Sequence, residues 1–165
     1  MGLDTLYKTV ISKGEYSCGD IGISTKEWFD LLNEPEASPY LETLYCFLRE
    51  PEHKGTCTTV AMKYGKPASH YNSKVTNFSK WVQKKLNRFR VVGIDGNDTY
   101  WCITMQKGKD TKLGFQWYMR DELAEALQSK LMKELISEFS TKEPFNGYEE
   151  EYKWGYWIRQ EEKMF

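Results

Sequence analysis

The stretch GTCTTVAMKYGKPASHYNSKVTNFSKW, residues 55–81, contains the strongest local structural signals in the chain. Thr56 is placed to cap a short helix over 57–64, and Gly65 supplies the left-handed residue that often ends a helix. Soon afterwards a second, longer helix is predicted over 70–87. Two helices joined by so short a connection predict a helix-turn-helix.

The second helix of this motif has two different faces. Apolar residues recur at spacings of four, three, four and four, the repeat of one helix face: Tyr71, Val75, Phe78, Val82 and Leu86. The other side presents Ser69, Ser73, Thr76, Asn77, Lys80 and Lys84. The apolar face therefore predicts a packed helix, whereas the polar face is either a solvated surface or a binding surface.

Charge is distributed unevenly along the chain. Residues 53–94 contain nine Lys or Arg and no Asp or Glu, although the whole chain has a net charge of −1. The rest of the chain is therefore strongly acidic. Such a separation of charge is the electrostatic footprint of a surface that binds a polyanion.

The segments around the motif predict an α+β fold. Residues 1–22 lack clear periodicity and predict an arm or a short extended segment, and two helices follow before residue 51. After the motif, RFRVVGI and TYWCITMQ alternate like strands and predict a β-hairpin over 89–106, and GFQWYM predicts a third strand. Three helices followed by a hairpin have the order of a winged helix-turn-helix, whose recognition helix enters the major groove.

We therefore expect a mainly helical α+β domain over 23–140, with a winged helix-turn-helix-like core, a β-hairpin wing and a long C-terminal helix. The tail, 141–165, combines tyrosines and tryptophans with a run of glutamates. Because disordered tails are poor in aromatic residues, we expect this one to dock on the domain or on a partner.

The residue types in the acid-free window suit contact with DNA. Lysine and arginine pair with phosphates, whereas hydroxyl and amide side chains bind phosphate oxygens or base edges. We expect backbone contacts from Lys66, Lys74, Lys80, Lys84, Lys85 and Arg88. We expect base readout from Ser69, His70, Asn72, Ser73 and Asn77. For any one of these residues, a solvated helix face is the alternative.

Other functional classes have weaker signals. No apolar run approaches the roughly 20 residues that cross a bilayer. His53 and Cys57 are four residues apart, but no second pair completes a metal site, and no phosphate-binding loop is present. We expect a non-enzymatic cytoplasmic protein without metal or cofactor, whose four cysteines are reduced and mostly buried.

Three motifs follow one another in order: GTCTTVAMKYGKPASHYNS, TYWCITMQKGK and FQWYMRDELAEAL. Together they resemble the N-terminal DNA-recognition module of McrB-type proteins, the nucleotide-driven subunits of modification-dependent restriction systems. The resemblance covers roughly residues 24–127 and lacks the nucleotide motor. It implies a DNA-sensing module of a defence system, with modified bases as targets and a motor or nuclease subunit as partner. The motif positions are Tyr64, Gly65, Tyr71, Asn72, Ser73, Tyr100, Trp101, Trp117, Arg120 and Glu122.

Two alternatives to duplex DNA remain open. Winged-helix folds also serve as protein docks, so the acidic N- and C-terminal parts could bind another subunit. Exposed aromatic residues could instead bind RNA by stacking on its bases. An aromatic pocket around Trp101 and Trp117 for a flipped base or a methylated group is a further, weaker possibility.

Overall fold

The computed structural model describes the backbone of residues 3–141 and the side chains of residues 3–138. Helices and strands are mixed along the chain, which confirms the predicted α+β class. The helices are α1 (Thr25–Leu32), α2 (Leu41–Leu48), α3 (Cys57–Tyr64), α4 (Ala68–Leu86), α5 (Trp101–Thr104) and α6 (Asp121–Thr141), with the short 3-10 helices η1 (Pro35–Tyr40) and η2 (Pro51–His53). The strands are β1 (Asp4–Ser12), β2 (Glu15–Cys18), β3 (Lys54–Thr56), β4 (Phe89–Val92), β5 (Met105–Thr111) and β6 (Gly114–Met119).

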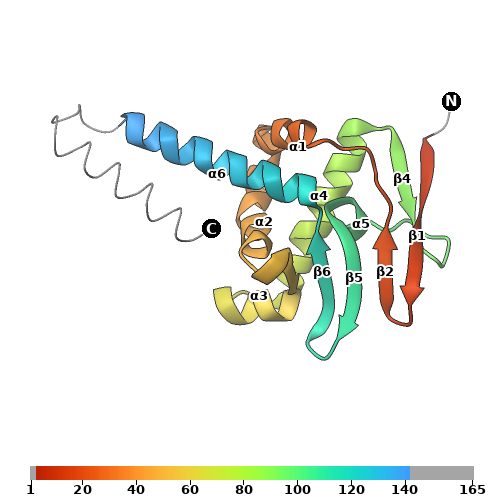
Figure 1. Cartoon of the computed structure of the whole chain (residues 1–165). Coiled ribbons are helices and arrows are strands. Elements are labelled where there is room, and N and C mark those ends of the chain that lie inside the picture. The colour runs from red at the N-terminus through yellow and green to blue at the C-terminus, as the bar shows by residue number, and fades with distance from the viewer. Residues whose placement is uncertain (1–2, 142–165) are drawn as a thin grey trace. The chain divides into compact units, whose positions relative to one another are not determined.

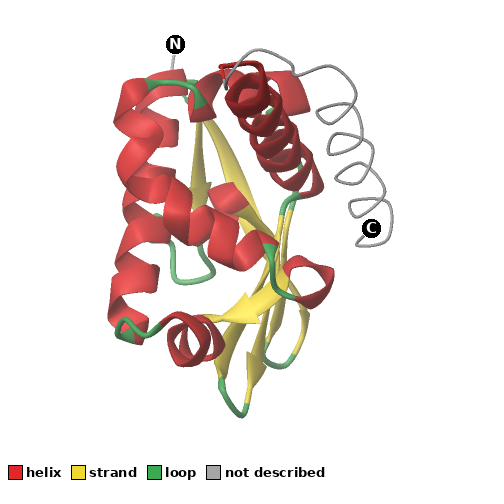
Figure 2. Cartoon of the chain, turned by 90° about the vertical axis from the view of Figure 1, so that its left-hand side faces the viewer, coloured by secondary structure: helices red, strands yellow, loops and turns green. Residues whose placement is uncertain are grey.

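The described strands form one mixed sheet in the order β3-β6-β5-β2-β1-β4 (Figure 1). β1 has two partners along its length. Its first half, Asp4 to Tyr7, pairs in parallel with β4, and its second half, from Lys8, pairs antiparallel with β2. The other pairs are antiparallel. Helices α1, α2 and α4 gather on one side of this sheet, which leaves its other face to solvent (Figure 2).

The core lies between the sheet and this helical layer. The apolar stripe predicted for the motif's second helix is confirmed, because Tyr71, Val75, Phe78 and Val82 of α4 are buried. The ring of Phe78 packs 6.3 Å, between centroids, from that of Trp28 in α1. Phe47 of α2 packs against Trp117 of β6, with ring centroids 5.5 Å apart. These contacts hold α1 against α4 and α2 against the sheet.

The expected wing over 89–106 is wrong. β4 pairs with β1 rather than with the following segment, to which a single bridge between Val92 and Asp98 connects it. Residues Trp101–Thr104 form the helical turn α5, in which Cys102, Ile103 and Thr104 are all buried. A real hairpin follows instead, formed by β5 and β6. The winged-helix assignment as a whole stays a prediction.

Residues 1–22 do not form a separate arm in the structure. Their extended conformation was expected, but β1 and β2 occupy inner positions of the sheet. The chain divides into the compact units 1–131 and 132–165. The described part of the second unit is the C-terminal half of α6, and the aromatic tail lies outside the described residues.

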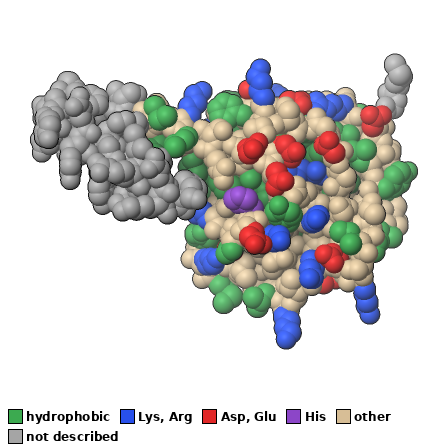
Figure 3. All heavy atoms as spheres, in the orientation of Figure 1, with side chains coloured by type: hydrophobic (Ala, Val, Ile, Leu, Met, Phe, Trp, Pro, Cys, Tyr) green, Lys and Arg blue, Asp and Glu red, His purple; other side chains and the backbone are tan. Residues whose placement is uncertain are grey.

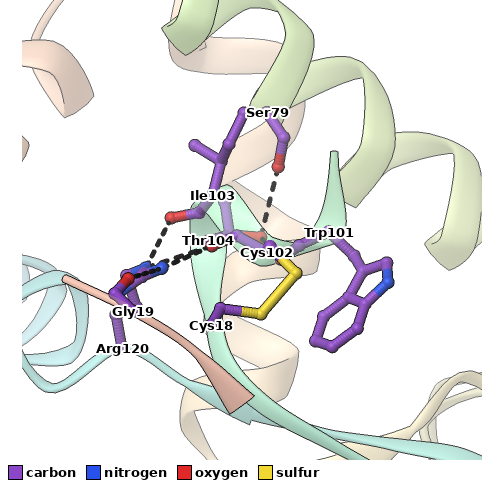
Figure 4. The surroundings of a disulfide bond; sticks show 8 residues. All are labelled: Cys18, Gly19, Ser79, Trp101, Cys102, Ile103, Thr104 and Arg120. Carbon is purple, nitrogen blue, oxygen red and sulfur yellow. Dashed lines mark hydrogen bonds between the residues drawn. A yellow bond between two sulfur atoms is a disulfide. The ribbon is translucent and has the colours of Figure 1, made fainter. Parts of the chain in front are cut away.

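A disulfide joins Cys18, at the end of β2, to Cys102 in α5 (Figure 4). The expectation of four reduced cysteines is therefore wrong for this pair, which the fold brings together across 84 residues of sequence. Cys46 and Cys57 are free thiols, Cys46 buried and Cys57 half-buried. The sequence did not indicate that Cys18 pairs with Cys102, because no short cysteine motif connects residues so distant in sequence.

Candidate nucleic-acid interface

The α3–α4 connection is built by local interactions that the sequence predicts. The amide of Thr59 donates to Thr56 Oγ1 (2.9 Å), and the amide of Thr56 donates to Thr59 Oγ1 (3.1 Å), which together cap α3. Gly65 ends the helix with a φ of 95°, and its amide donates to the carbonyl of Ala61 at 2.8 Å. After Pro67 at the N-cap, α4 begins two residues earlier than predicted. The connection between α3 and α4 is thus fixed on both sides of the turn.

One face of α4 is exposed and polar along the length of the helix. Ser69, Ser73, Asn77, Lys80 and Lys84 follow at spacings of four, four, three and four, so they share one face. Asn72 and Lys66 are exposed beside them. His70 is half-buried, and its ring lies edge-on to Tyr71 with centroids 5.2 Å apart. These exposed polar residues form one surface, here named the α4 face, with His70 at its margin. Lys74 is half-buried and lies to one side of this stripe.

Acidic residues from elsewhere neutralise part of the basic window. Among the nine lysines and arginines of residues 53–94, five form ion pairs. They are Lys54 with Glu52, Lys63 with Glu50, Lys85 with Glu34, Arg88 with Glu27 and Arg90 with Asp98. Two of the expected phosphate contacts, Lys85 and Arg88, are thus already paired. In the described residues, Lys66, Lys74, Lys80 and Lys84 form no ion pair, and all four belong to α4 or its N-terminal turn.

The pairing of Arg88 is the strongest of those near α4. Arg88 Nη1 donates to Glu27 Oε2 at 2.7 Å and Nη2 donates to Glu27 Oε1 at 3.0 Å, so the contact is bidentate. These hydrogen bonds hold the pKa of Glu27 below its ordinary value. Arg88 Nη2 also donates to the carbonyl of Gly22, which ties the end of α4 to the segment before α1. Arg88 therefore has a structural role, since it connects the end of α4 to α1 and to the segment before it.

Two of the unpaired lysines are positioned by aromatic rings. Lys74 Nζ lies 5.7 Å from the ring centroid of Tyr40, and Lys80 Nζ lies 5.0 Å from that of Tyr100. Such contacts hold an ammonium group without neutralising it, because the ring carries no net charge. Both lysines therefore keep a full positive charge for a partner.

A concavity of about 250 Å³ lies where α3 and α4 begin. We name it the helix–hairpin concavity, and it is lined by Thr56, Cys57, Thr58, Ala68, Ser69, Asn72, Leu113, Gly114, Phe115 and Trp117. The first turns of both helices contribute to it, and neither turn contains an acidic residue. Burial raises the pKa of the Cys57 thiol to about 11. The β5–β6 turn completes the wall, a contribution that the sequence did not predict because only the tertiary fold brings a hairpin turn beside a helix start.

Several positions of the McrB-like motifs have structural roles in this chain. Gly65 ends α3, and Tyr71 and Trp117 are core residues. The buried guanidinium of Arg120 donates to the backbone carbonyls of Gly19, Cys102 and Ile103 (Figure 4). Asn72 and Ser73 differ from these, because they are exposed on the α4 face. Tyr64, which was expected to face inward, is 41% exposed.

The remaining signals give no comparable site in the described residues. His53 Nδ1 lies 2.8 Å from the carbonyl oxygen of Leu48, and no cluster of three His, Cys, Asp or Glu side chains there could hold a metal. Trp101 packs on Phe115 with centroids 5.1 Å apart, so it does not form an open aromatic pocket with the buried Trp117. No helix within residues 3–141 has the length and apolarity needed to cross a bilayer. Acidic and basic side chains are mixed over the face shown in Figure 3.

Comparison of the chain with protein-family models, with curated proteins and with solved structures finds no significant match.

Proposed function

We propose that this chain is a double-stranded DNA-binding module. The observation that carries the proposal is the α4 face, on which exposed hydroxyl and amide side chains lie toward the N-terminus of the helix, and lysines that form no ion pair in the described structure lie toward its C-terminus. No acidic residue belongs to α4 or to the turn before it, whereas acidic and basic side chains are mixed over the face in Figure 3. A surface of this kind attracts phosphates and offers donors and acceptors to base edges.

In this proposal the residues of the α4 face have separate tasks. Lys66, Lys74, Lys80 and Lys84 bind phosphates, and each contact releases counterions from the DNA. Ser69, Asn72, Ser73 and Asn77 bind base edges, since amides can pair with adenine in the major groove. Lys85 and Arg88 contribute less than the sequence suggests, because each must first leave a glutamate.

The resemblance to McrB-type modules supports a more specific version. On that basis we propose that the module acts in the cytoplasm as part of a restriction or defence system, with a motor or nuclease subunit as its partner and modified bases as possible targets. Binding to plain and cytosine-modified duplexes of one sequence separates general DNA binding from modification sensing. Equal affinities would remove the modified base from the proposal and leave the DNA-binding function.

Charge reversal on α4 tests the proposal directly. We expect Lys80→Glu with Lys84→Glu to weaken binding of a fluorescent duplex by at least about tenfold at low salt, because two phosphate contacts become repulsive. The matched control is Lys107→Glu with Lys109→Glu. These exposed lysines flank Gly108 in β5, whose inner side faces Phe115 and Trp101, so they point to the opposite face of the sheet.

The outcomes separate the proposal from its alternatives. A loss of duplex affinity in the α4 variant, without a loss in the control variant, supports DNA binding by this face. Equal losses in both variants would show only a general effect of net charge and would contradict the proposal. Preference for RNA or for single strands over the duplex, in competition at one salt concentration, would favour the RNA-binding alternative.

A further inference from the structure

The turn between β5 and β6 is a second basic feature beside α4, and residues 111–114 are here named the hairpin tip. Lys112 is exposed and forms no ion pair within the described part of the chain, and Leu113 is 52% exposed. The carbonyl of Gly114 accepts a hydrogen bond from Thr111 Oγ1 at 2.6 Å, and the amide of Leu113 donates to the same hydroxyl at 3.3 Å. The tip is therefore a turn with internal hydrogen bonds that present Lys112 and Leu113 outward.

The hairpin tip lies against the start of α3. A Cβ placed on Gly114 would be 3.7 Å from Thr58 Oγ1, so the tip lies beside a side chain of the first turn of α3. Leu113 lines the helix–hairpin concavity on one side of the tip. On the other side it lines a second concavity of about 440 Å³, which is also lined by Lys54, Lys112 and the ion pair of Lys63 with Glu50. The tip thus projects between two hollows next to the first turn of α4.

We infer that the hairpin tip is a second DNA contact, with Lys112 on a phosphate and Leu113 at the edge of the adjoining groove. The inference rests on the proposed function, and it gives β5–β6 the place of the wing that the sequence predicted at residues 89–106. Charge favours DNA as the occupant, because no acidic side chain lines the helix–hairpin concavity and the exposed Lys112 is next to Leu113, which does line it. Apolar side chains at a groove edge are common in proteins that bind DNA this way.

A duplex that contacts both the start of α4 and the hairpin tip must pass over the concavity between them. Cys57 lines that concavity and is half-buried, whereas Cys46 is buried and the other two cysteines are joined. Cys57 is therefore a built-in reporter of occupancy, and its alkylation rate can be followed by mass spectrometry of the full chain. Ser69 and Asn72 of the α4 face line the same concavity, so protection of Cys57 shows that DNA covers the concavity, and the Lys112 substitution shows whether the hairpin tip takes part.

The test combines substitution with protection. We expect Lys112→Ala to lower affinity for a duplex about three- to tenfold at low salt and to reduce the slope of log K against log salt by about 0.9, the effect of one phosphate. Lys107→Ala, on the other face of the sheet, is expected to change neither quantity. We also expect saturating duplex to slow alkylation of Cys57 by at least about fivefold, with thermal melting of each variant as the check on folding.

The failure of this inference is distinguishable from failure of the proposed function. If Lys112→Ala binds like the wild type and DNA leaves Cys57 equally reactive, while the α4 double variant still loses affinity, the hairpin contact is overturned and the function stands. If the wild-type chain does not bind DNA at all, both the hairpin contact and the proposed function are contradicted. Slower alkylation of Cys57 in the presence of DNA, together with a loss of duplex affinity in Lys112→Ala, supports the inference.

Discussion

At the scale of the residue, Arg120 illustrates how a charged side chain can serve the fold. It is 5% exposed, and its guanidinium holds carbonyls from the end of β2 and from α5 against the start of α6 (Figure 4). Burial lowers its pKa to about 10, so it remains protonated at neutral pH. Hydrogen bonds from a charged donor are stronger than neutral ones, and here they satisfy the buried carbonyls of Cys102 and Ile103 as well as the carbonyl of the exposed Gly19.

We expect Arg120→Met to lower the free energy of unfolding by about 2–4 kcal/mol, because it leaves those carbonyls without a donor. Urea denaturation followed by tryptophan fluorescence measures the change. Arg49→Met is the matched control, since Arg49 is exposed and forms no ion pair in the described structure. Its effect should stay within about 0.5 kcal/mol. Equal stabilities for the two variants would show that the carbonyl contacts contribute little.

Cys57 allows a pH prediction. A thiol with a pKa of about 11 is far less ionised at pH 8 than an ordinary cysteine, and only the thiolate is alkylated readily. We expect its reaction with iodoacetamide at pH 8 to be roughly a hundredfold slower than that of a free cysteine, and to rise tenfold for each pH unit up to about 10. A rate that levels off near pH 9 would contradict the burial of this thiol.

At the scale of the element, local signals predicted helices better than strands. The cap at Thr56 and the stripe on α4 depend on residues a few positions apart, and both are confirmed. The strands depend on distant partners. Residues 107–111 of the charged run KGKDTK belong to β5. Lys107 and Lys109 point to the solvated face, while Gly108 lies between them on the inner face, covered by the rings of Phe115 and Trp101. No local pattern reveals which β6 residues will cover that glycine.

We expect Gly108→Ala to cost about 1–3 kcal/mol of stability through overpacking. A Cβ at this position would lie 2.4 Å from Phe115 Cζ and 2.7 Å from a ring carbon of Trp101, and both rings are packed in place. Gly19→Ala is the control, because nothing lies within 4 Å of its added Cβ. Thermal denaturation of both variants measures the difference. A neutral Gly108→Ala would show that the aromatic pair can move aside without loss.

At the scale of the whole molecule, the sequence indicated which residues form a basic surface, but not which of them are paired with acidic residues. The acid-free window and the polar face of α4 are visible in the sequence, so most residues of the candidate site could be predicted. The pairing of Lys85 with Glu34 and of Arg88 with Glu27 could not, because these glutamates belong to a helix and a loop that only the tertiary fold brings to α4. The place of the hairpin tip beside α3 could not be predicted either, because it also depends on the tertiary fold.

These ion pairs lead to an electrostatic prediction. We expect Glu27→Gln with Glu34→Gln to raise affinity for a duplex about two- to tenfold at low salt, because Arg88 and Lys85 become free to bind phosphates. The salt dependence should steepen as the number of phosphate contacts increases. Fluorescence anisotropy at several salt concentrations measures both effects.

The control removes the same charge elsewhere, with Asp4→Asn and Glu122→Gln, two exposed residues that form no ion pair in the described structure. A gain of the same size in this control would assign the effect to net charge. The pairing of Arg88 and Lys85 would then be irrelevant to binding.

The central claim is that the α4 face binds duplex DNA through its phosphates. The most direct measurement is the affinity of the full chain for a labelled duplex over a series of salt concentrations. Four unpaired lysines predict binding at low salt and a linear fall of log K with log salt, with a slope of roughly −3 to −4. Absence of binding at the lowest salt concentration, or an affinity that does not change with salt, would contradict the claim.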